Sequence, residues 1–210
     1  MKRTADDNDL ISPTRLISFS DGVFAIAVTL LVFNLKVPEI PEGDVHRLLP
    51  AAMKAMWPHL DTYVISFLLV AVYWTTHHRM LNTVRHVDSR FIWLNLLYLL
   101  MIGFIPFPSA LMGTYPEERL TFDFYVGSMM LVSLLSLSMW WYATWDLRLV
   151  DKNLSPWKVR HYFIRGIFVL AILITAILLS FYNVRWGFYC LGAPFPMQWA
   201  LRLYFRKKMD

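Results

Sequence analysis

The sequence predicts an all-α membrane protein in which each subunit crosses the bilayer with six helices. Hydrophobic residues make up 57% of the chain and charged residues 17%, which is too little charge for a soluble domain of 210 residues. The apolar residues gather in runs of about 20 along the whole length, and a helix of that length crosses a hydrocarbon core. Residues 1–210 are therefore expected to form one six-helix transmembrane domain.

The first expected span covers residues 15–37 and follows a polar tail, residues 1–12, which is expected in the cytoplasm. As an α-helix, the stretch from Arg15 to Lys36 rises by about 31 Å, close to the thickness of the bilayer core. Pro38 cannot continue the helix and is expected to stop it. No cleavable signal peptide is expected, because this apolar run is too long for one.

The chain after Pro41 contains the run LLPAAMKAMW, which reads as a short amphipathic helix at the membrane interface. Gly103, Pro106 and Pro108 are expected to kink or break the far half of the third span. Five further spans are expected at about residues 59–80, 91–112, 120–145, 165–182 and 186–203. The last of these has the weakest helical pattern, because Pro194 lies in its middle.

The distribution of basic residues predicts the orientation. Loops after the second and fourth spans and the C-terminal end are rich in Lys and Arg, whereas the loops after the third and fifth spans carry only Arg119 and Arg185. The positive-inside rule then places both termini in the cytoplasm. The formal net charge of +5 is assigned to this orientation rather than to nucleic-acid binding.

The motifs of common enzyme classes are missing from the sequence. It lacks the signatures of serine hydrolases, zinc metalloproteases and nucleotide-binding loops, and the filter loop T-V-G-Y-G of potassium channels. The single Cys190 excludes an intramolecular disulfide and a cysteine metal cluster. His77 and His78 are adjacent, so on a helix they point about 100° apart and do not form a metal pair. The sequence therefore predicts neither an enzyme nor a bound cofactor or metal.

The first span carries a polar cluster that includes Ser20 and Asp21. A carboxylate there costs about 2.5–3.5 kcal/mol if it faces lipid, so Asp21 needs a partner or water. His77 and His78 return to the same side of the membrane and are the expected partners. Two interpretations follow: a buried polar clamp, to which Asn95 contributes, or a proton relay in a proton-coupled carrier or proton-conducting protein that uses Asp21 and His77. The residues alone favour the clamp.

The remainder of the first span is apolar and carries a stripe at helical spacing. Ile26, Leu30 and Phe33 share one face, with Thr29 beside it. Taken alone, such a stripe is expected to pack against other helices of the same subunit. The rise from Arg15 places Ile26 near the bilayer centre, about 16 Å further along the helix.

The motifs in this span resemble those of a known family. Arg15 stands four residues before Phe19-Ser20-Asp21, and the run Ala25-Ile-Ala-Val-Thr-Leu-Leu follows. This pattern resembles the first-helix signature of the bacterial potassium channels related to lysosomal transmembrane protein 175. The stretches around Trp74 to His78, Asn95 and Pro106-Phe107 are similar to the second and third helices of that family. The resemblance extends over the whole chain in length and span count, and its specific motif covers about fifteen residues.

The resemblance implies a homotetramer in the cell membrane that conducts potassium ions through a central pore. The four first helices line this pore, and Ile26 corresponds to the ring of bulky aliphatic side chains at its constriction. Thr29 corresponds to a neighbouring ring implicated in selectivity, and Leu30 and Phe33 to further hydrophobic layers. The residues that correspond to the network holding the first helix in place are Arg15, Phe19, Ser20, Asp21, His77 and Asn95.

Overall fold

The computed structural model describes residues 12–192, and this part of the chain is helical without a β-sheet. An isolated antiparallel bridge joins Val84 to Val150. The helices are α1 (Thr14–Leu30), η2 (Leu31–Asn34), η3 (Glu42–Asp44), α2 (Val45–Ala55), α3 (Trp57–Thr83), α4 (Ser89–Phe104), α5 (Pro106–Thr114), α6 (Arg119–Thr144), η4 (Trp145–Leu147), α7 (Pro156–Ser180) and α8 (Val184–Cys190). The predicted all-α class is confirmed.

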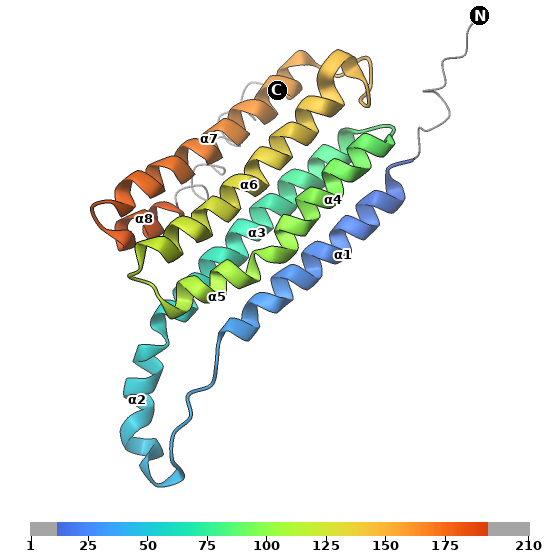
Figure 1. Ribbon diagram of the computed structural model, residues 1–210. Coiled ribbons are helices and arrows are strands. Elements are labelled where there is room, and N and C mark those ends of the chain that lie inside the picture. The colour runs from blue at the N-terminus through green and yellow to red at the C-terminus, as the bar shows by residue number, and fades with distance from the viewer. Residues whose placement is uncertain (1–11, 193–210) are drawn as a thin grey trace, which may run out of the picture.

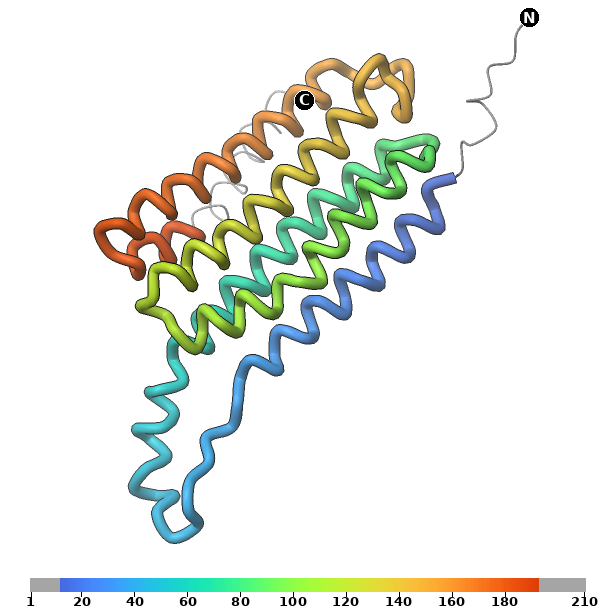
Figure 2. Tube along the Cα trace, viewed as in Figure 1, coloured from blue at the N-terminus to red at the C-terminus, as the bar shows by residue number. Residues whose placement is uncertain are grey.

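The long helices form a bundle with a common direction (Figure 1). α1 packs against α3 and α4, while α7 packs against α6 and α8, so α1 and α7 lie on opposite sides of the bundle. α2 and the extended segment that precedes it project beyond one end of the bundle (Figure 2). A helix was predicted there, and α2 confirms it, with no buried residue along its length.

Four helical segments of the described part are long and apolar enough to cross a membrane: Thr14–Asn34, Ser89–Thr114, Arg119–Leu147 and Pro156–Ser180. A fifth candidate is the pair Glu42–Ala55 and Trp57–Thr83, whose axes are bent by 43°. The predicted sixth span, residues 186–203, overlaps α8 up to Cys190 and a turn at residues 191–192, and the rest of it lies outside the described residues. The polar tail, residues 1–12, lies outside them apart from Ser12.

The helix of the first span ends earlier than predicted. α1 tightens into the 3₁₀ turn η2, and Leu35 after it is extended, with φ −90° and ψ 95°. Val37 precedes a proline, and the proline ring disfavours the helical conformation of the residue before it. The helix therefore ends three residues before the predicted end at about residue 37.

The predicted break in the third span is confirmed. α4 ends at Phe104 and α5 begins at Pro106, so the break falls at Ile105. A proline at this point has no N–H to donate, and its ring clashes with the carbonyl four residues earlier. The fifth span differs, because α7 begins at Pro156 rather than near residue 165. Pro156 occupies the first turn, where proline favours helix initiation.

The core between α3, α4 and α6 contains three buried tyrosines with hydrogen-bonded hydroxyls. Tyr73 donates to the carbonyl oxygen of Met129 at 3.0 Å. Tyr98 donates to the carbonyl oxygen of Tyr73 at 3.4 Å, and the hydroxyls of Tyr125 and Ser66 are 2.7 Å apart. Buried tyrosines contribute large apolar surfaces and fix orientation through the hydroxyl. This frame supports α1.

Candidate functional site

The first helix has one face packed on its own subunit and one face uncovered. Ser20, Phe24, Ala27 and Leu31 are buried against the bundle, and their spacing of four, three and four residues keeps them on one side. On the opposite side, Ile26 is 62% exposed and the neighbouring turns are exposed as well. The sequence interpretation that this stripe packs against other helices of the same subunit is therefore wrong for the described part of the chain.

The uncovered face is apolar along most of its length. Phe19 and Ile26 lie on α1, Leu30 is its last residue, and Phe33, in η2, is 75% exposed. Thr29 is also exposed, but its hydroxyl donates to the carbonyl oxygen of Ile26 at 2.8 Å. Because that donor is used within the helix, Thr29 presents hydroxyl lone pairs rather than an O–H. The face thus offers bulky apolar side chains with one acceptor oxygen among them.

A buried polar network joins this helix to α3 and α4. The Nε2 atom of His77 lies 2.7 Å from Oδ1 of Asn95, and Nδ2 of Asn95 donates to Oγ of Ser20 at 3.2 Å. Ser20 in turn donates to the carbonyl oxygen of Leu16 at 2.7 Å. Because an amide oxygen only accepts, Nε2 of His77 carries the proton. The network is directional and ends on a backbone carbonyl.

Aromatic contacts hold the His77 ring in place. It stacks on Tyr98 with ring centroids 4.9 Å apart and an interplanar angle of 4°. Phe24 of α1 contacts the same ring with centroids 5.6 Å apart. All three side chains are buried, so the polar network is shielded from both lipid and water. Nδ1 of His77 has no hydrogen-bond partner among the described residues, so the hydrogen bond from Nε2 to Asn95 is the polar contact that specifies how this ring packs.

Asp21 belongs to a second, half-exposed cluster. Its Oδ1 atom accepts a hydrogen bond from Nε1 of Trp74 at 2.8 Å and lies 3.6 Å from Nδ1 of His78. The expected partner His78 is present, whereas His77 makes its hydrogen bond to Asn95 instead. Trp74 completes this cluster and was not among the predicted site residues. The sequence contains a signal for this contact, because Trp74 precedes His78 by one helical turn and both side chains therefore share the face of α3 that meets Asp21.

Two of the predicted network residues lie apart from both clusters. Arg15 is exposed, and it makes no hydrogen bond or ion pair with the residues that the structure describes. Phe19 is 54% exposed and belongs to the uncovered face rather than to the packed one. The inference that these residues hold the first helix to the second and third is therefore wrong for a single described subunit.

A further contact fixes the far end of the first span. Nδ2 of Asn34 donates to the carbonyl oxygen of Pro106 at 3.3 Å, at the start of α5. In the sequence, Asn34 is a polar residue within an apolar run. The break that Pro106 creates gives Asn34 its acceptor. The first span is thus anchored by polar contacts at both ends, and its uncovered face lies between them.

No group of three or more His, Cys, Asp or Glu residues suited to a metal occurs between residues 12 and 192. Among the described residues, the conspicuous feature of the site is therefore the uncovered apolar face and its polar anchors.

Comparison with known proteins identifies the family. The family model described as endosomal/lysosomal potassium channel TMEM175 matches residues 15–106. A potassium channel of Streptomyces collinus is 35% identical over 147 residues, which cover 67% of this chain and 69% of that protein. A potassium channel of Chamaesiphon minutus is 34% identical over 142 residues, covering 66% and 70% of the two chains.

A solved structure matches over nearly the whole length. It is the crystal structure of a lysosomal potassium-selective channel TMEM175 homologue from Chamaesiphon minutus, with a TM-score of 0.76 and 30% identity. The match covers 90% of this chain and 96% of that chain. The fold is thus that of a multi-pass membrane protein, and the predicted resemblance is confirmed. This chain belongs to the TMEM175 family.

Proposed function

We propose that this chain is the subunit of a homotetrameric potassium channel whose pore is lined by the uncovered face of α1. The observation that carries the proposal is the exposure of Ile26, Leu30 and Phe33 on a helix whose other face is firmly packed. Potassium as the permeant ion is supported by the bacterial relatives named potassium channels and by the solved potassium-selective homologue. Four copies arranged around a central axis cover this face and give it an aqueous lumen.

Ile26 forms the constriction in this proposal. A ring of four isoleucines near the bilayer centre excludes water when the helices are close together, and an ion then loses hydration without compensation. When the helices move apart, a partly hydrated ion passes. A modest preference for potassium over sodium follows, because the larger ion gives up its hydration at lower cost. Thr29, one turn further, offers an acceptor oxygen to a passing cation.

The polar anchors have a structural role in the proposal. The network of Ser20, Asn95 and His77 holds α1 against α3 and α4, while Asp21 is held by Trp74 and His78. These contacts hold α1 on its own subunit while its other face lines the proposed pore. The channel lies in the cell membrane with both termini in the cytoplasm, as the distribution of basic residues favours.

Ion flux into liposomes tests the proposal. Purified protein is expected to carry potassium down its gradient faster than sodium under matched gradients, because dehydration at Ile26 costs potassium less. Protein-free liposomes and liposomes with heat-inactivated protein give the background. Equal transport of both ions would contradict the selectivity, and flux at the background level would contradict the channel.

A second candidate function is proton permeation, which the names of the animal relatives favour. The human relative, named an endosomal/lysosomal proton channel, is 31% identical over 107 residues, or 50% of this chain and 21% of that protein. The predicted relay between Asp21 and His77 lacks a direct contact, and the network of His77 ends on the carbonyl oxygen of Leu16. Acidification of the liposome lumen under an imposed pH gradient, lost on His77→Ala with the fold intact, would favour this function over the potassium channel.

A further inference from the structure

A groove lies at the start of α7, at the end of the bundle where α1 begins. It has a volume of about 810 Å³ and is formed by the α6–α7 connection and the first three turns of α7. Its lining changes in character along its length. The connection and the first turns contribute Lys152, Asn153, Ser155 and Arg160 together with apolar side chains such as Leu154 and Val159, whereas the later turns contribute only Phe163, Ile164 and Ile167. The basic side chains of the groove therefore lie at one end only, and the other end is apolar; the first is called the basic end and the second the apolar end.

The basic end carries permanent positive charge that is open to a ligand. Lys152 and Arg160 are both exposed, and a guanidinium stays protonated at any physiological pH. The acidic residue next to Lys152 is Asp151, which pairs with Arg85 at 3.4 Å. Asp151 therefore does not neutralise the groove by itself. An anionic group is the chemical complement of this end.

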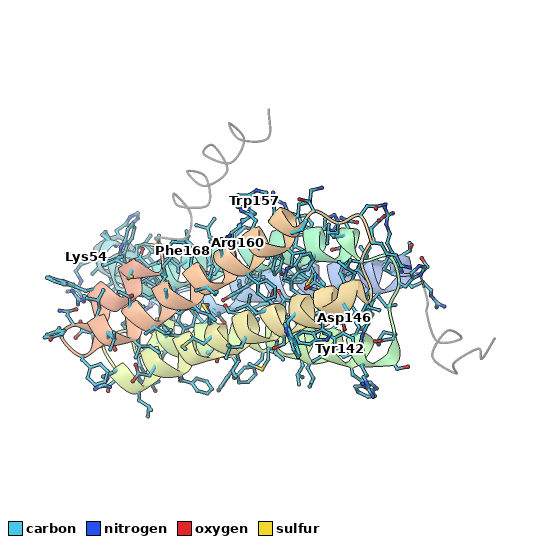
Figure 3. All side chains as sticks on the ribbon, turned by 90° about the horizontal axis from the view of Figure 1, so that it is seen from above. Lys54, Tyr142, Asp146, Trp157, Arg160 and Phe168 are labelled. Carbon is cyan, nitrogen blue, oxygen red and sulfur yellow. The ribbon has the colours of Figure 1, made fainter. Side chains whose placement is uncertain are left out.

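The apolar end runs along α7 into the membrane-spanning part of that helix. α7 is a candidate span with few buried residues, and Ile167 is 59% exposed. Figure 3 shows Trp157, Arg160 and Phe168 in succession along α7 at one edge of the molecule. A ligand whose anionic group binds at Arg160 can therefore place an apolar tail along α7, toward the membrane interior.

The groove stays accessible in the tetramer proposed above. α7 packs on α6 and α8, on the side of the bundle opposite α1. If the four α1 helices surround the axis, α7 lies toward the surrounding lipid. The position of α7 toward lipid rests on the proposed function, whereas the charge and shape of the groove do not.

We propose that this groove binds an anionic phospholipid, with the phosphate at Lys152 and Arg160 and an acyl chain along Phe163, Ile164 and Ile167. Basic recesses between membrane helices are suited to anionic headgroups, and apolar contact along the acyl chain adds affinity that a free phosphate lacks. A bound lipid here bridges the α6–α7 connection and α7.

Native mass spectrometry of the full-length protein in detergent tests this proposal. Phosphatidylglycerol is titrated against the native chain, Lys152→Gln, Arg160→Gln and the double variant, with Lys158→Gln as the matched control. Lys158 is an exposed basic residue on α7 that does not line the groove. Each groove substitution is expected to weaken binding about fivefold, from the usual contribution of one basic side chain near a membrane surface. The Lys158→Gln protein is expected to bind like the native chain.

Two further titrations separate the sources of affinity. Phosphatidylcholine with the same acyl chains is expected to bind more weakly than phosphatidylglycerol, and sn-glycerol 3-phosphate is expected not to occupy the site at the same concentration. Three results would overturn the proposal: an equal loss of phosphatidylglycerol affinity in the Lys158→Gln protein, no loss of affinity in the double variant, or binding of phosphatidylcholine or sn-glycerol 3-phosphate as tight as that of phosphatidylglycerol. Binding is read without ion flux, so failure of the channel proposal leaves this test intact.

Discussion

Replacing Ile26 by asparagine is expected to raise potassium flux about tenfold or more and to erode the preference for potassium over sodium. In the proposed pore a ring of isoleucines excludes water, whereas an amide at the same place offers hydrogen bonds to water and ions. Lowering the barrier by about 1.4 kcal/mol accounts for a tenfold change in rate. The measurement is potassium and sodium flux into liposomes at equal protein density.

A matched control isolates the position of the substitution. Ile174 is also an exposed isoleucine, at 48%, and it belongs to α7, the helix on the side of the bundle opposite α1. The Ile174→Asn protein is expected to conduct like the native chain, because that residue faces lipid in the proposed tetramer. Equal flux through the Ile26→Asn and native proteins, or an equal rise in the Ile174→Asn protein, would contradict the proposal that Ile26 forms the constriction.

Replacing His77 by leucine is expected to destabilise the protein far more than the same change at His78. At position 77 the substitution leaves the amide oxygen of Asn95 buried without its donor, which costs about 1–3 kcal/mol. It also removes the stacked ring between Phe24 and Tyr98. The pair of His78 with Asp21 is half exposed, and such pairs contribute about 0–1 kcal/mol.

The measurement is the midpoint of thermal unfolding in detergent, with the native chain, His77→Leu and His78→Leu measured side by side. The adjacent positions carry the same residue, so each variant serves as the control of the other. A larger loss for His78→Leu would show that the Asp21 cluster, rather than the buried network, holds α1 in place.

Much of the architecture was predictable because it depends on local covalent and apolar patterns. Pro106 fixed the break of the third span through its missing N–H, and the apolar runs identified the four helical segments of the described part that are long and apolar enough to cross a membrane. The two faces of α1 were also visible as spacing. Spacing alone favoured packing within the subunit, however, and only the positions of α3 and α4 show that Ile26 is left uncovered.

The partners of polar residues were less predictable, because they depend on how helices rotate against each other. Asp21 was expected near both histidines, yet adjacent helical residues point about 100° apart and only His78 faces it. His77 points instead to Asn95 on α4. The contact of Asn34 with Pro106 joins positions 72 residues apart, and no local pattern encodes it.

Cysteine accessibility at position 33 tests most directly whether the uncovered face of α1 lines the ion pathway. Phe33→Cys is made in a Cys190→Ser background and treated with a cationic methanethiosulfonate reagent, with Ile174→Cys as the lipid-facing control. Modification is expected to lower potassium flux through the Phe33→Cys protein and to leave flux through the Ile174→Cys protein unchanged, because only the positive group attached at position 33 lies in the proposed pore. Complete modification at position 33 with unchanged flux would contradict it and place the ion pathway elsewhere.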